Sequence, residues 1–101
     1  MIRHEVLTST LRFYNSESED AFEPYVAICT IQWETANVIW IKGMHGSITR
    51  AHLREFLDFC IANKVETVKA YRSSGHTLPF MKHVDLHMEL NVSEVMARLY
   101  K

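Results

Sequence analysis

The sequence predicts a single α/β domain over residues 1–101, with a mixed sheet and a helix that connects two parallel strands. The segment 37–72 reads as strand, glycine-containing turn, amphipathic helix and strand, which is typical of a right-handed crossover. The apolar and β-branched run 25–33 and the first strand of this segment, 38–41, are joined by a short link, which favours an antiparallel hairpin. The expected order is therefore β-β-β-α-β, then a short helix, a strand and a C-terminal helix.

The first elements follow from local composition. Residues 5–14 mix apolar side chains with threonines, a pattern that favours a strand. The polar segment 15–24 is expected to be an exposed, solvated connection, and a partner-binding acidic loop is the alternative. The two runs of the hairpin are almost continuously apolar, which predicts central strands that are buried on both faces.

The long helix is defined by its cap and by its apolar spacing. Thr49 is the expected N-cap, with Ile48 and Leu53 as a hydrophobic staple. Residues 63–64 end the helix. Its buried face is predicted to consist of apolar side chains at helical spacing, namely Leu53, Phe56, Leu57, Cys60 and Ile61.

The remaining elements are shorter. Residues 65–72 resume strand character, and residues 73–75 break it. Residues 77–84 are expected to form a short helix that tolerates Pro79 in its first turn. Residues 85–90 alternate apolar and polar side chains, which predicts a half-exposed edge strand. Ser93 is the expected cap of a last helix, whose apolar side is Val95, Met96 and Leu99.

Composition limits the classes of function. Eleven basic against twelve acidic residues give a net charge of -1, so general nucleic-acid binding is not expected, although a local basic patch is compatible with this balance. No signal peptide or membrane span is predicted, and a cytoplasmic location is expected. Cys29 and Cys60 lie in apolar surroundings and are expected to be reduced, buried thiols rather than a disulfide.

The main candidate site is the predicted strand-to-helix turn. Its two glycines allow close approach of the backbone, the helix end supplies free N–H groups, and two side chains add positive charge. An anion is the expected ligand, and a turn without a ligand is the alternative reading. The candidate binding residues are Lys42, Gly43, Met44, His45, Gly46, Ser47 and Arg50.

Other polar and aromatic residues were weighed as sites. His76 follows the second parallel strand and is a candidate general base, with a plain polar turn as the alternative. The six histidines do not have the spacing of a metal site, so no metal is expected. Trp33 and Trp40 are expected to be core and rim aromatics rather than a stacking platform, because basic residues do not alternate with them.

The order of elements over residues 25–90 resembles that of the GCN5-related N-acetyltransferase (GNAT) family, in the manner of its short, degenerate members, some of them carried by phages. The run 43–48 aligns with the family's pyrophosphate-binding turn, and Gly46 matches one of its glycines. The run departs from the family pattern in two ways: Gly43 replaces an Arg or Gln, and Ile48 replaces a small residue. The Tyr acid of the family has no counterpart between Arg72 and Tyr100.

The resemblance implies a small protein that binds acetyl-CoA or a related acyl-CoA at residues 42–50. As an N-acyltransferase it would act on a small-molecule or protein acceptor, with His76 or Glu34 as base. The alternative is a non-catalytic protein-interaction module that retains the fold. In that case the hairpin tryptophans and the edge strand 85–90 would form the interface, including that of a homodimer.

Overall fold

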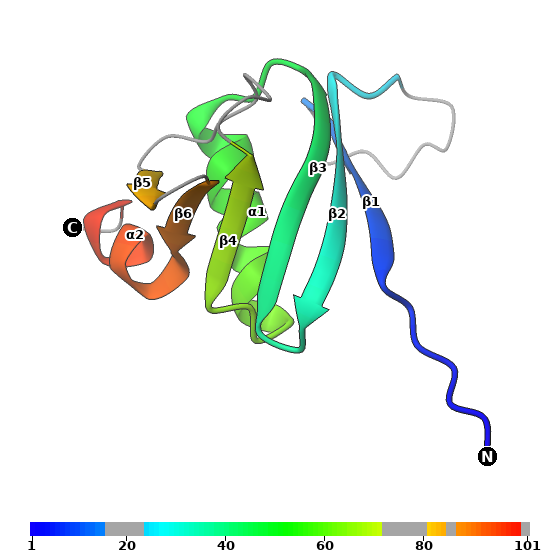
Figure 1. Cartoon of the computed structure of the whole chain (residues 1–101). Helices are drawn as coiled ribbons and strands as arrows, with labels where there is room; N and C mark the ends of the chain where they lie inside the picture. Colours follow the sequence, from blue (N-terminus) through cyan, green and yellow to red (C-terminus); the bar gives the residue numbers. More distant parts are fainter. Residues whose placement is uncertain (16–23, 72–80, 85–86, 100–101) are drawn as a thin grey trace.

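The computed structural model describes residues 1–15, 24–71, 81–84 and 87–99. They form a small α/β domain with a six-stranded mixed sheet and two helices, so the predicted fold class is confirmed at this level. Figure 1 shows the long helix α1 packed behind the sheet and the short helix α2 beside the last strands. Neither of these helices is long and apolar enough to cross a membrane.

The N-terminal strands form an antiparallel meander. It consists of β1 (Thr8–Phe13), β2 (Ala27–Thr35) and β3 (Val38–Gly46). Helix α1 (Arg50–Ala62) then returns the chain to β4 (Thr67–Tyr71), which pairs with β3 in parallel. The predicted hairpin and the predicted crossover are therefore both confirmed.

The C-terminal part completes the sheet out of chain order. It consists of β5 (Lys82–Val84), β6 (His87–Asn91) and α2 (Val92–Leu99). β6 lies between β4 and β5 and is antiparallel to both, which gives the strand order β1-β2-β3-β4-β6-β5. The half-exposed strand near 85–90 is confirmed for its described part, but its expected place at the edge is wrong because β5 covers its outer side.

Two further predictions for this part are wrong. Residues 82–84 form a strand and not the end of a short helix, and residues 77–80 lie outside the described residues. The cap of α2 is Asn91 rather than Ser93, because the Asn91 Oδ1 accepts a hydrogen bond from the Glu94 N–H at 3.0 Å. Val95 and Leu99 are buried, as their spacing predicts.

Helix α1 begins and ends where the sequence places it. Thr49 is the N-cap and Asn63 the C-cap. The predicted face is buried except at Ile61, which is 51% exposed. Each residue advances about 100° around the helix axis, so Ile61 lies about 80° from Leu53. The buried stripe extends instead to the other side, where His52 is 3% exposed.

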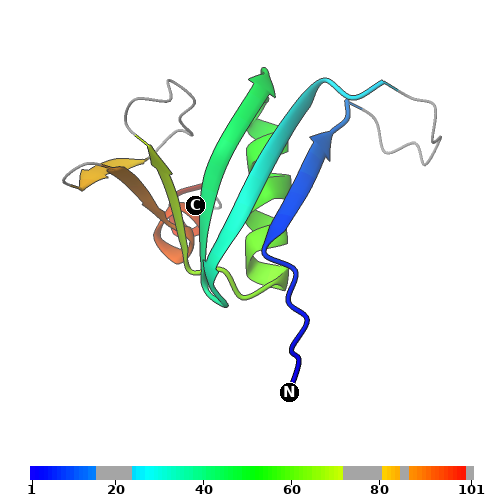
Figure 2. The same ribbon diagram turned by 45° about the vertical axis from the view of Figure 1, so that its right-hand side comes forward.

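The prediction that β2 and β3 are buried on both faces is wrong. Side chains on one face, such as Cys29, Ile31 and Ile39, join α1 in the core. Side chains on the opposite face are only half-buried or exposed, Gln32 and Trp40 among them. In Figure 2, α1 lies behind the sheet and the face of β1 to β4 turned toward the viewer carries no described element. We call this the open face.

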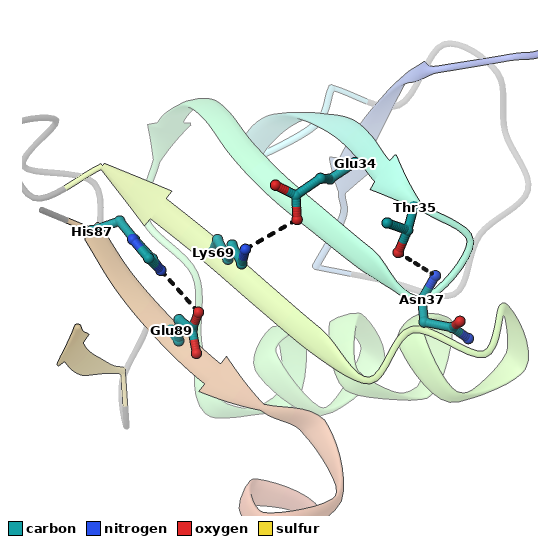
Figure 3. Close-up of polar contacts among 6 residues, drawn as sticks. All are labelled: Glu34, Thr35, Asn37, Lys69, His87 and Glu89. Atoms are coloured by element: carbon teal, nitrogen blue, oxygen red, sulfur yellow. Dashed lines mark hydrogen bonds and ion pairs between the residues drawn. The ribbon is translucent and has the colours of Figure 1, made fainter. Parts of the chain in front are cut away.

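A tight junction joins the hairpin turn to the end of α1. The Asn37 side-chain amide donates to the Lys64 carbonyl at 2.8 Å, and the Asn37 carbonyl accepts from the N–H of Glu66 at 2.8 Å. The Asn37 N–H donates to the Thr35 Oγ1 (Figure 3). Lys64 adopts a left-handed conformation, with φ of 60°, to reverse the chain here. These contacts fix where β4 starts beside β3.

Candidate functional site

The structure places most of the candidate segment within β3. Lys42, Gly43, Met44, His45 and Gly46 all belong to this strand, so the connection to α1 is only residues 47–49. The expectation of a glycine turn at 43–46 is therefore wrong. The strand is irregular at Lys42, because Thr30 pairs with Gly43 whereas the next residue, Ile31, pairs with Ile41. Lys42 is the extra residue of a β-bulge.

β3 is longer than the strand beside it. The pairing with β4 covers Val38–Ile41 and Thr67–Ala70, and β4 ends one residue later at Tyr71. Within the described part of the chain, β4 pairs with none of residues 42–44. Backbone N–H and C=O groups along a strand edge that extends past its neighbour can pair with an added extended segment.

The two glycines of this segment have different surroundings. Gly46 has φ of 89°, and a Cβ there would collide with the Val26 carbonyl oxygen and lie 2.9 Å from the Ala27 Cα. Close packing against the start of β2 thus explains this glycine without a ligand. At Gly43, by contrast, no described atom beyond its chain neighbours lies within 4 Å of the place a Cβ would take. A side chain there would enter open space.

The start of α1 is held by His52, which sequence reasoning did not single out as a cap. The His52 N–H donates to the Thr49 Oγ1 at 3.2 Å, and the Thr49 N–H donates to the His52 Nδ1 at 3.0 Å. The His52 Nε2 then donates to the Tyr14 carbonyl at 2.9 Å. With Nδ1 as acceptor and Nε2 as donor, the ring is the neutral Nε2–H tautomer. Ser47 and Arg50 remain exposed beside this helix end, and its first turn contains no acidic residue.

A cluster of aromatic rings and lysines occupies the open face. Trp40 stacks on Tyr71 with ring centroids 4.8 Å apart, and the His87 ring lies 5.4 Å from Trp40. The Lys69 ammonium lies 5.4 Å from the Trp40 ring centroid, and the Lys42 ammonium lies 4.7 Å from that of Tyr71. These contacts join β3, β4 and β6, so we call Trp40, Lys42, Lys69, Tyr71 and His87 the aromatic–lysine cluster.

Carboxylates neutralise only part of this cluster (Figure 3). Glu34 accepts from Lys69 at 3.0 Å, and Glu89 lies 2.8 Å from the His87 Nε2. Hydrogen bonds lower the pKa of Glu34 below its usual value. The bond from Lys69 has the largest effect, and one from Trp40 has the next largest. The Lys42 ammonium instead donates to the Tyr71 hydroxyl at 2.9 Å and has no carboxylate partner among the described residues.

The candidate base Glu34 does not lie near the end of β3, where the candidate binding segment 42–50 leads into α1. Ala27, the first residue of β2, pairs with Gly46, whereas Glu34 lies seven residues further along β2. At the rise of an extended strand this is a separation of about 23 Å. A lowered pKa also makes the carboxylate a weaker base at neutral pH. The other candidate base, His76, lies outside the described residues.

The cluster was missed because its members are distant in sequence. Trp40 lies opposite Lys69 in the parallel pair, and Tyr71 lies opposite His87 in the antiparallel one. The residues next to Trp40 in the chain are apolar, so the local sequence around it does not indicate contacts with basic side chains. Alternation across 38–42, with Trp40 and Lys42 two residues apart, was the available signal for a shared face. Trp33 is half-buried against the core, as predicted.

Two cavities are lined by other parts of the described chain. One of about 210 Å³ lies between β5, β6 and α2, and includes Lys82 and Glu94. The other, of about 380 Å³, lies between residues 5–7 and the end of β2, and includes Trp33 and Glu34. Neither is lined by a residue of the segment 42–50.

Comparison of the chain with known protein families, with curated proteins and with solved structures gave no match.

Proposed function

We propose that the chain binds an acyl-CoA-type anion, acetyl-CoA or a related acyl-CoA, along the end of β3 and the start of α1. The observation that carries this proposal is the extension of β3 past its last pair with β4, so that residues 42–44 have no strand pair with β4 in the described chain. An extended pantetheine arm could pair with the edge of these residues as an added strand does.

Charge and shape at the same place support the proposal. Lys42 and Arg50 supply positive charge for phosphates, and the first turn of α1 lacks acidic side chains that would repel them. Gly43 leaves the strand surface open to a close approach. The resemblance to the GNAT family suggests the same class of ligand, because β3, α1 and β4 occur in the order expected for it.

The proposal concerns binding and includes no reaction. Transfer of the acyl group to an amine would require a base close to the thioester. Glu34, one of the two bases named from the sequence, lies about 23 Å along the strand from Gly46. It is also held as a carboxylate by Lys69. An N-acyltransferase activity therefore rests on the family resemblance alone.

Calorimetry with acetyl-CoA tests the proposal. Gly43→Val should weaken binding, because its side chain would fill the space over the strand that Gly43 leaves open to a ligand. It should leave the fold intact, because valine suits a strand and its Cβ would meet no atom of the described residues. Arg50→Ala should weaken binding by roughly 1.5–3 kcal/mol, the value of a hydrogen bond to a charged group. Lys64→Asn removes one positive charge at the far end of α1 and serves as the matched control.

The result that contradicts the proposal is simple. If millimolar acetyl-CoA gives neither heat nor a rise in melting temperature with the unmodified chain, the acyl-CoA reading is rejected. Gly46→Val cannot serve as this test, because its side chain would collide with the β2 backbone and disturb the fold whether or not a ligand binds.

A second candidate function is a non-catalytic interaction module that retains the fold. The aromatic–lysine cluster favours it, because rings and cations gathered on a sheet face that no described element covers are typical of a binding surface. Homodimerisation through the strand 85–90 is not part of it, since β6 lies inside the sheet. Lys42 belongs to both sites. Arg50 belongs only to the first and Lys69 only to the second, so variants of these two residues distinguish the functions.

A further inference from the structure

The open face presents an ordered array of side chains across four strands. The strand register places Gln32, Trp40 and Lys69 in one row. It places Arg12, Ile28 and His45 in another, four residues closer to the start of β2. Between the rows lie the small residues Thr30 and Gly43, which pair with each other. The array therefore has a low floor between two groups of larger side chains.

Positive charge is concentrated on this face. From β1 to β4, the positions that point away from α1 hold three cations, Arg12, Lys42 and Lys69, and one carboxylate, Glu34. The excess of two positive charges contrasts with the chain as a whole, where acidic residues outnumber basic ones and the net charge is -1. A face of this kind attracts a polyanion although the molecule does not.

Aromatic rings accompany these cations at two places. Tyr71 is 44% exposed and belongs to the aromatic–lysine cluster. Tyr25 is also exposed, and the Arg12 guanidinium lies 5.6 Å from its ring centroid. β1 and β3 are separated by two strand spacings, about 10 Å. Two ring-and-cation groups thus lie on either side of the low floor.

We propose that the open face binds single-stranded nucleic acid, an inference that rests on the second candidate function. Proteins that bind single strands combine cations that track the phosphates with aromatic side chains on which bases stack. The face supplies both: Lys42, Lys69 and Arg12 for phosphates, and Tyr71 and Tyr25 for bases. A flat sheet face accepts a strand with splayed bases, as the sheets of single-strand RNA-binding domains do.

Other polyanions fit the same face less well. An acidic peptide would use the lysines and Arg12, but its carboxylates would not stack on the exposed Tyr71 and Tyr25 rings as bases do. A DNA duplex is read by an element that enters a groove, and the described residues of this face form a sheet surface without such a projection. Both remain as outcomes of the test.

Fluorescence anisotropy with labelled 20-nucleotide oligo(dT) and oligo(U) is the test. We expect binding at 50 mM salt that weakens roughly 18-fold at 200 mM, as release of counterions from three phosphates predicts. Tyr71→Ala should weaken binding about fivefold or more, because it removes a stacking ring. Tyr71→Phe keeps the ring and should bind within about twofold of the unmodified chain.

Charge variants locate the binding on this face. Lys69→Ala should weaken oligonucleotide binding and reduce its salt dependence, because one phosphate contact is lost. Lys64→Asn and Arg50→Ala also remove one cation each, but both residues lie on the α1 segment, and they should leave oligonucleotide binding unchanged. Circular dichroism melting confirms that each variant is folded.

Each contrary result has a definite meaning. The proposal is overturned if neither oligonucleotide binds at 50 mM salt with 100 µM protein, or if Tyr71→Ala binds as the unmodified chain does. Equal binding of a duplex or of poly-glutamate also overturns it. If poly-glutamate alone binds and Lys69→Ala weakens it, the interaction module survives without nucleic acid. The effect of Arg50→Ala on acetyl-CoA binding tests the acyl-CoA proposal separately, and none of these oligonucleotide or poly-glutamate results decides it.

Discussion

His52 connects three parts of the chain through one buried ring. Its Nδ1 accepts from the Thr49 N–H, its Nε2 donates to the Tyr14 carbonyl, and its ring meets Phe13 edge-on at 5.7 Å. The helix start, the end of β1 and the core therefore share a single side chain. Histidine at this position of a capping box is unusual, since glutamate or glutamine commonly reaches back to the cap.

Two substitutions of His52 separate its bond to the Thr49 cap from its bond to the Tyr14 carbonyl. His52→Ala should lower the free energy of unfolding by roughly 1–3 kcal/mol, because it leaves the partly buried Tyr14 carbonyl and the Thr49 N–H without their His52 partners. His52→Gln should lose less, since glutamine can restore the bond to the cap. Urea denaturation measures both values. Equal losses in the two variants would show that the capping bond contributes little.

Single residues also mark the limit of what the sequence could predict. The glycine pair was recognised, but its two members act differently, and the difference depends on β2, whose start packs against Gly46. That contact joins residues about twenty positions apart, and no local pattern records it. The Thr49 cap, by contrast, was predicted correctly because it depends on the residues next to it.

Within α1, burial rather than hydrophobicity should determine the cost of a substitution. Phe56 is 1% exposed, and Phe56→Ala should lower the free energy of unfolding by about 3–5 kcal/mol. Ile61 belongs to the same apolar spacing but is exposed at the end of the helix, so Ile61→Ala should cost less than about 1 kcal/mol. Chemical denaturation of the two variants compares them directly. A large loss for Ile61→Ala would contradict the burial seen here.

Elements with a strong period were predictable, and those set by distant pairing were not. The helical spacing of apolar residues in α1 and the apolar runs of β2 and β3 predicted the correct type of secondary structure. The strand–helix–strand order of the crossover predicted the parallel pairing of β3 and β4. β5 has three residues and no period of its own, so its strand conformation depends on pairing with β6. The position of β6 beside β4 likewise depends on pairing between residues that are distant in the sequence.

At the scale of the molecule, two buried thiols should make stability depend on alkaline pH. Burial raises the pKa of Cys29 to about 11 and that of Cys60 to about 12, from the ordinary thiol value of 9.0. The unfolded chain therefore releases these protons first. The contribution of the thiols to stability is complete below pH 9 and is lost as pH rises through 11 and 12.

Denaturation at a series of pH values measures this effect. Between pH 9 and 11 the free energy of unfolding should fall by up to about 1.4 kcal/mol per pH unit for each thiol. A variant with Cys29→Ala and Cys60→Ala is less stable throughout, but its slope over this range should be smaller. Lysine and tyrosine ionisation is common to both proteins and cancels in the comparison. Identical slopes would mean that the thiols ionise equally in the folded and unfolded chains.

The candidate site was less predictable than the fold. The segment 42–50 was identified from its glycines and charges, but the sequence did not show that β3 extends past β4. The aromatic–lysine cluster was not identified at all, because Trp40, Lys69 and His87 come from three strands. Local patterns reveal which residues share an element, whereas a surface is made by the order in which elements are placed side by side.

The insertion of β6 between β4 and β5 has a consequence for synthesis on the ribosome. The first four strands and α1 emerge before residue 72, and they can assemble while one side of β4 is still bare. β5 emerges next, yet its only strand partner in the described chain is β6, so it must wait as extended chain. Until residues 87–91 are synthesised, the nascent domain exposes the edge of β4 to other copies of the chain that are being translated from the same messenger RNA. A pause in translation just before β6 would thus expose the chain to pairing between copies.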